Sequence, residues 1–136
     1  MKQRDCGVVG RRCFVTGVLA ATVVVVSRQA GAVPRSLVEL GRRFQALRRR
    51  LASTKPGELD EALEGFEGEL HTIMTELGDR LGVAGTKSGR VTAIMGQPDA
   101  RREGQWIYLW RGWHDYLYFE VAKGCVVSAD WYMAGE

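Results

Sequence analysis

The stretch from Trp106 to Val121 most constrains the fold of this chain, because it reads as a β-hairpin rich in aromatic, β-branched and aliphatic residues. These residue types favour pleated strands, and the interruption Arg111–Asp115 supplies a turn. All four Trp and all four Tyr of the 136-residue chain lie between Trp106 and Tyr132. The sequence therefore predicts a sheet in the C-terminal part of the chain, and function has to be argued from the surface of that sheet.

The residues around this hairpin predict two further elements. We expect strands at Gln105–Trp110, Tyr116–Val121 and Cys125–Tyr132, with a tight turn before the third strand, so that they form a three-stranded antiparallel meander. A short helix is predicted from Ser88, a capping residue type, to Met95, with Gly96 ending it.

Upstream, apolar residues recur at three- and four-residue steps in two segments, which predicts helices over residues 36–52 and 58–81. Lys55–Gly57 is a stop and turn signal, so the two helices should form an antiparallel hairpin. Residues 34–56 carry seven basic residues against one acidic, and residues 57–82 carry one against eight. We expect these charges to pair between the helices; the alternative is that the arginines bind phosphate or anionic lipid.

The N-terminal residues have the order of an export signal. A basic segment is followed by the uncharged run Cys13–Val26 and by the small-residue pattern Ala30–Ala32, after which we predict cleavage. Arg11 and Arg12, followed by Cys-Phe-Val, resemble a twin-arginine signal peptide. The run is shorter than the roughly 20 residues of a spanning helix. An uncleaved membrane anchor, including one in an organelle membrane, is the alternative.

The predicted fold class is α+β: an N-terminal leader, an antiparallel helical hairpin, then a short helix and a three-stranded antiparallel meander. The expected divisions are residues 1–32 as signal peptide or membrane anchor, 34–82 as the helical hairpin, and 84–136 as a small α+β sheet domain. Hydrophobic content of 46% and charged content of 26% are ordinary for a globular protein.

Alternation along the hairpin divides its side chains into two sets. The set that we expect to face the helices is Ile107, Leu109, Leu117, Phe119 and Val121. The set that we expect on the opposite face is Trp106, Tyr108, Trp110, Tyr116, Tyr118 and Glu120. An aromatic face left partly open is a recognition surface. The alternative is that the helical hairpin folds back and covers it.

Several short motifs resemble the SmpA/OmlA (BamE-like) domain family: Thr86–Ala93, Ile94–Asp99, the Trp106-Ile-Tyr108 strand, Phe119, and Gly124-Cys-Val126. The resemblance covers roughly residues 84–130. It implies a helix pair followed by a three-stranded sheet, in an envelope accessory protein that binds other proteins and, in part, lipid, without enzymatic activity.

Catalytic and metal-binding motifs are not evident in the sequence. There is no P-loop, no dinucleotide-binding glycine motif and no paired Cys or His spacing. His114 and Asp115 are adjacent, so their side chains should point apart rather than form a dyad, and Asp115 should stabilise the turn. We therefore expect no enzyme, no catalytic residue, no metal and no cofactor.

Two functions remain. The first is an exported or membrane-associated interaction module whose aromatic face binds a protein partner. The second is a small-ligand or single-stranded nucleic-acid binding module that uses the same face, with Arg101, Arg102 and Arg111 as phosphate contacts. The net charge of +3 and the charge balance of residues 83–136 argue against nucleic acid. Membrane association and homo-oligomerisation through the helical hairpin stay open. The predicted binding residues are Trp106, Tyr108, Trp110, Arg111, Trp113, His114, Tyr116 and Tyr118.

Overall fold

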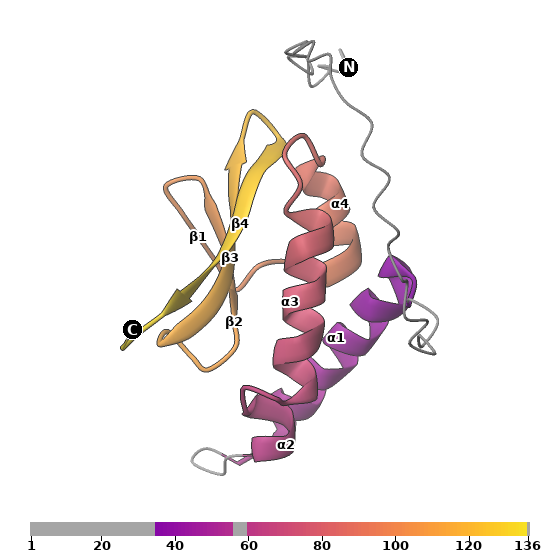
Figure 1. Ribbon diagram of the computed structural model, residues 1–136, viewed down its shortest axis with the longest axis vertical. Helices are drawn as coiled ribbons and strands as arrows, with labels where there is room; N and C mark the ends of the chain where they lie inside the picture. The colour runs from indigo at the N-terminus through magenta and orange to yellow at the C-terminus, as the bar shows by residue number, and fades with distance from the viewer. Residues whose placement is uncertain (1–34, 56–59, 136) are drawn as a thin grey trace, which may run out of the picture. The chain divides into compact units, whose positions relative to one another are not determined.

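The computed structural model describes residues 35–55 and 60–135, which form a two-layer α+β arrangement of helices on one face of an antiparallel sheet (Figure 1). The helices are α1 Leu37–Ser53, α2 Glu61–Glu64, α3 Glu69–Leu81 and α4 Ser88–Met95. The strands are β1 Ala100–Arg102, β2 Gln105–Leu109, β3 Asp115–Ala122 and β4 Cys125–Met133. The predicted leader lies outside the described residues. Within the described ranges, no helix combines the length and the apolar character needed to cross a membrane.

Helix α1 begins with a complete capping box. The Ser36 hydroxyl accepts a hydrogen bond from the Glu39 backbone N–H at 3.2 Å, and the Glu39 carboxylate accepts one from the Ser36 N–H at 2.8 Å. These bonds satisfy two backbone donors that have no intrahelical partner, which fixes the start of the helix. The backbone and hydroxyl of Ser36 hold the pKa of Glu39 below its usual value.

The second predicted helix is broken, which is a correction to the expectation of one helix over residues 58–81. The chain forms the short α2, turns through Gly65–Gly68 and restarts as α3. A Cβ on Gly65 would lie 2.5 Å from the Glu61 carbonyl oxygen, and one on Gly68 would lie 2.7 Å from that of Leu63. This close backbone turn therefore requires glycines, and it interrupts the helix that the apolar periodicity predicts.

Helices α1 and α3 run antiparallel and pack together, as predicted (Figure 1). Arg43 forms a bidentate ion pair with Glu69, with nitrogen–oxygen distances of 2.6 and 2.7 Å, and Arg50 contacts Asp60 at 2.6 Å. The expected pairing of basic and acidic segments is thus observed near the turn. These groups are substantially exposed and screened by solvent, so each pair contributes little to stability and mainly sets the register of the two helices.

The sheet contains the three predicted strands and one that the sequence did not reveal. The strand order is β1-β2-β3-β4, and every neighbouring pair is antiparallel. Strand β1 is joined to β2 by a turn in which Glu103 and Gly104 have φ values of 47° and 86°. It was missed because it is three residues long and reads Ala-Arg-Arg, without the apolar alternation by which strands are recognised.

One hydrophobic cluster joins the helices to the sheet. It includes Leu40 and Phe44 of α1, Leu70 and Leu77 of α3, and Phe119 of β3, each fully buried. Residues from Arg35 onward belong to one compact unit. The helices therefore cover one face of the sheet, and among the residues that the structure describes no second layer covers the other face. This determines where a binding surface lies.

Candidate binding surfaces

The register of the hairpin divides the aromatic residues differently from the prediction. Tyr108 pairs with Leu117, and Trp106 pairs with Phe119, so each pair shares one face of the sheet. The assignment of strand β3 is confirmed, because Leu117 and Phe119 are buried in the core. The predicted faces of β2 are wrong. The connection between β2 and β3 pairs even-numbered residues of β2 with odd-numbered residues of β3, so Trp106 and Tyr108 share the face of Leu117 and Phe119. A one-residue change of register moves every side chain of a strand to the other face.

Trp106, Tyr108 and Trp110 therefore lie toward the helices and not on an open surface. Tyr108 is fully buried, and its phenol donates a hydrogen bond to the Gly96 carbonyl at 2.8 Å. Its ring packs edge-on against Phe44 and Phe119. Burial raises its pKa strongly. This satisfied hydroxyl lets a tyrosine take a core position that the sequence pattern assigned to an aliphatic residue.

The opposite face carries a group of aromatic residues that we call the open-face cluster: Trp113, Tyr116, Tyr118 and Tyr132. Tyr116 and Tyr132 are cross-strand partners whose rings stack at 4.8 Å. Trp113 and Tyr118 each pack edge-on against Tyr116, at 6.2 and 6.3 Å. Trp113 is 47% exposed and Tyr132 46% exposed. The cluster is thus a contiguous aromatic platform that the helices do not cover.

Charged residues border this cluster. The Arg102 guanidinium lies 4.3 Å from the centre of the Trp113 ring, in a cation–π arrangement. Glu120 and Asp130 are exposed on the same face, and Asp130 is the cross-strand partner of Tyr118. Partial burial and these two carboxylates raise the pKa of the Tyr118 phenol, so the hydroxyl stays protonated and can donate a hydrogen bond at neutral pH. The border is therefore mixed in charge.

A second aromatic group lies at the end of the sheet, on the helix side. The His71 ring lies 4.4 Å from Trp110 and 4.9 Å from Trp131, and Phe66 packs edge-on against Trp110 at 5.1 Å. Desolvation lowers the pKa of His71, so its neutral form is favoured inside this aromatic setting. His71 and Phe66 come from the helical segment, and nothing in their local sequence indicated contact with the sheet.

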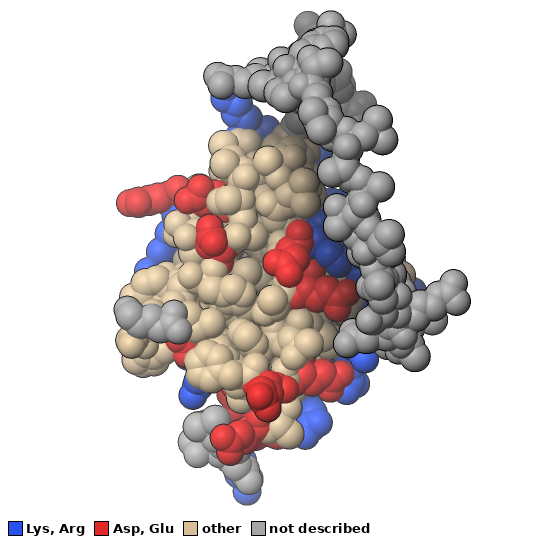
Figure 2. Space-filling view, in the orientation of Figure 1, with Lys and Arg blue, Asp and Glu red and all other residues tan. Residues whose placement is uncertain are grey.

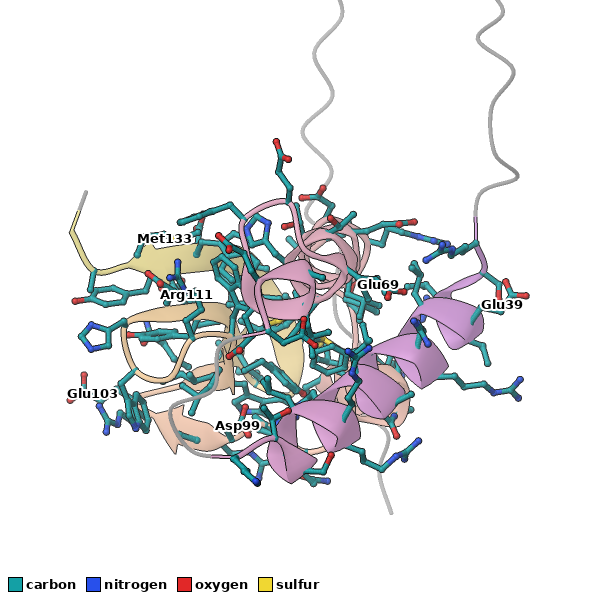
Figure 3. All side chains as sticks on the ribbon, turned by 90° about the horizontal axis from the view of Figure 1, so that it is seen from below. Glu39, Glu69, Asp99, Glu103, Arg111 and Met133 are labelled. Atoms are coloured by element: carbon teal, nitrogen blue, oxygen red, sulfur yellow. The ribbon has the colours of Figure 1, made fainter. Side chains whose placement is uncertain are left out.

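The loop Trp110–His114 links the two surfaces. The Asp115 carbonyl accepts hydrogen bonds from the backbone N–H groups of Trp110 and Arg111, each at 3.1 Å, which closes the loop. The Asp115 carboxylate is largely buried and lies 3.9 Å from the Arg111 guanidinium. His114 is exposed, and within the described residues no hydrogen bond joins its imidazole to Asp115. Figure 3 shows Arg111 and Met133 at the same end of the sheet.

Of the eight predicted binding residues, the structure brings Trp113, Tyr116 and Tyr118 together on the open face. Trp106, Tyr108 and Trp110 lie on the covered face, while Arg111 and His114 border a hollow at the end of the sheet. The prediction omitted Tyr132. Its alternation with Trp131 and the tight turn before β4 could have indicated it. Among the residues that the structure describes, no group of three or more His, Cys, Asp or Glu side chains is arranged to hold a metal.

Comparison of the chain with protein-family models, with curated proteins and with solved structures found no match.

Proposed function

We propose that this chain is a non-enzymatic interaction module, exported or membrane-associated, which binds a protein partner through the open-face cluster. The observation that carries the proposal is the asymmetry of the sheet. One face is covered by helices, whereas on the other the rings of Trp113, Tyr118 and Tyr132 each contact that of Tyr116; Trp113 and Tyr132 are about half exposed, and Tyr116 and Tyr118 are partly exposed. Clustered exposed aromatic residues are typical of protein recognition surfaces, where Tyr and Trp are enriched.

The polar atoms of the cluster support the same function. In the described part of the chain, the hydroxyls of Tyr116, Tyr118 and Tyr132 and the Trp113 indole N–H make no hydrogen bond to protein. Each can bond to a peptide group of a partner while its ring supplies apolar contact area. The rings hold one another in place, so less side-chain entropy is lost on binding than with isolated exposed side chains.

The alternative, a small-ligand or single-stranded nucleic-acid binding module, draws support from Arg102 beside Trp113, because an arginine next to a stacking ring fits a phosphate and its base. The other two arginines of that hypothesis lie elsewhere: Arg101 packs on Trp106, and Arg111 on Trp110 and Phe66. Exposed Glu120 and Asp130 on the same face would repel phosphate. The arrangement therefore favours a protein partner.

The proposed localisation of the module is inferred from the sequence. The leader-like residues 1–32 and the resemblance to envelope accessory domains support export or membrane association, with release into an extracytoplasmic compartment if the leader is cleaved. Mass measurement of the protein from fractionated cells would distinguish a start at Val33 from a retained Met1.

Site-specific photo-crosslinking in cells tests the binding proposal. A photoreactive residue at position 113 or 118 should give discrete protein adducts. The same residue at position 49 on the exposed side of α1 serves as the control and should not give those adducts. No adduct from positions 113 and 118, or the same adducts from position 49, would argue against the open-face cluster as the binding surface.

A further inference from the structure

Phe66 is exposed in a way that the core does not explain. It is 57% exposed, although its ring rests against Trp110 at 5.1 Å and His71 at 5.8 Å. Phe66 belongs to the apolar periodicity of the helical segment together with Leu63 and Leu70, and both of those leucines are buried. The turn through Gly65–Gly68 instead places the Phe66 ring at the surface. An exposed ring held on one side by other aromatic rings is a preorganised docking point.

Two hollows flank this ring. The larger, of about 600 Å³, is bordered by Glu64, Phe66, Arg111, Asp115 and Met133, among others. The second, of about 470 Å³, is bordered by Glu61, Phe66 and Glu67. Both are open depressions, and Phe66 lines both. They have room for side chains of a docked segment on either side of the ring.

The charge around Phe66 is predominantly acidic. Asp60, just before α2, forms an ion pair with Arg50, and Glu69, the first residue of α3, forms one with Arg43. Between them, Glu61, Glu64 and Glu67 have no cationic partner in the described residues. Figure 2 shows acidic side chains near the end of the molecule where α2 lies, with Lys and Arg side chains beside them. The cation that borders the larger hollow, Arg111, is near Asp115.

We propose that the surface formed by Phe66, Glu61, Glu64 and Glu67 docks a basic segment of a partner protein, one that carries lysine or arginine beside an apolar side chain. Charge complementarity selects a basic segment over an acidic or neutral one. The Arg111 guanidinium lies 5.4 Å from the centre of the Phe66 ring, within cation–π distance on one side of it. This second surface is separate from the open-face cluster, and the proposal does not depend on the function of that cluster.

Fluorescence anisotropy on the full chain tests the proposal. The probe is a short labelled peptide in which lysine alternates with leucine, and the comparison peptide has glutamate in place of lysine. We expect the lysine peptide to bind and the glutamate peptide not to bind, with affinity falling from low to physiological ionic strength. Phe66→Ala should weaken binding about tenfold, because an anchoring ring is removed. Glu61→Gln with Glu67→Gln should weaken it about 2- to 30-fold, from two exposed charge pairs.

A charge-matched double variant provides the control. Asp79→Asn with Glu103→Gln removes two exposed acids far from Phe66 in the sequence and should leave binding unchanged. Tyr116→Ala should also leave it unchanged, which separates this surface from the open-face cluster. Equal weakening by both double variants would overturn the proposal, because it would show attraction to overall charge alone. Concentration-dependent self-association of the chain in sedimentation equilibrium, abolished by the Glu61/Glu67 double variant, would also overturn it by assigning the surface to a second copy.

Discussion

Gly41 of α1 lies in close contact with Ile94 of α4, and replacing it should loosen the helical layer. A Cβ at this position would lie 2.4 Å from the Ile94 carbonyl oxygen and 2.8 Å from the Ile94 Cγ2 atom. The first of these is a backbone atom, so no rotamer change can relieve the overlap. Gly41→Ala therefore requires the two helices to separate.

The size of the effect follows from two opposing terms. Forcing an extra methyl group into a packed contact costs about 1–3 kcal/mol. Alanine is favoured over glycine inside a helix by about 1 kcal/mol, which offsets part of that cost. Because the contact is with backbone, we expect the upper part of the range to apply, for a net loss in the free energy of unfolding of about 1–2 kcal/mol.

Urea unfolding monitored by tryptophan fluorescence measures this difference, and Gly89→Ala is the matched control. Gly89 lies in α4, and a Cβ there would meet nothing within 4 Å, so alanine should be neutral or stabilise by up to about 1 kcal/mol. If Gly41→Ala were as stable as the wild type while Gly89→Ala behaved as expected, the close crossing of α1 and α4 would be refuted, and with it the way in which the helical layer is fixed.

Two further predictions concern the contact between helix and sheet at Asp99 and the partly buried His71. Asp99→Ala should lower the free energy of unfolding by about 1–3 kcal/mol. The reason is that the carboxylate of Asp99 (Figure 3) pairs with Arg48 and accepts a hydrogen bond from the Leu109 N–H at 2.8 Å. Asp99→Asn keeps an acceptor and should lose less stability in the same urea titration. His71 has a lowered pKa in the fold, so the unfolded chain binds a proton more readily, and stability should fall as pH drops below about 6.5. His71→Phe should remove that slope between neutral pH and the range where carboxylates titrate, and an unchanged slope would contradict the desolvation of His71.

The sequence predicted the elements of the fold well where local signals agree. The periodicity of α1 and the β-forming residues of the last three strands are local features, and the structure confirms these elements. The complementary charges of the helical segments predicted their antiparallel pairing, and the Arg43–Glu69 contact is consistent with it.

The errors arose where the position of a side chain depends on contacts between segments that are distant in the sequence. The face of β2 depends on the register between two strands, and the connection between them sets that register, so alternation within β2 could not give it. The exposure of Phe66 depends on a glycine turn that overrides apolar periodicity, and Tyr108 is buried because Gly96 supplies an acceptor for its hydroxyl. The candidate surface was consequently predicted in its residue type and in the face of its β3 residues Tyr116 and Tyr118, but not in its β2 members.

Tyrosine footprinting of the free protein and of its crosslinked complex tests the central claim most directly. A tyrosine-specific reagent, followed by mass spectrometry, should modify Tyr116, Tyr118 and Tyr132 in the free protein and leave the buried Tyr108 unmodified. In the complex, the three open-face tyrosines should become protected. If their modification is the same with and without the partner, the open face is not the binding surface; if Tyr108 reacts in the folded protein, the assignment of the two faces is wrong.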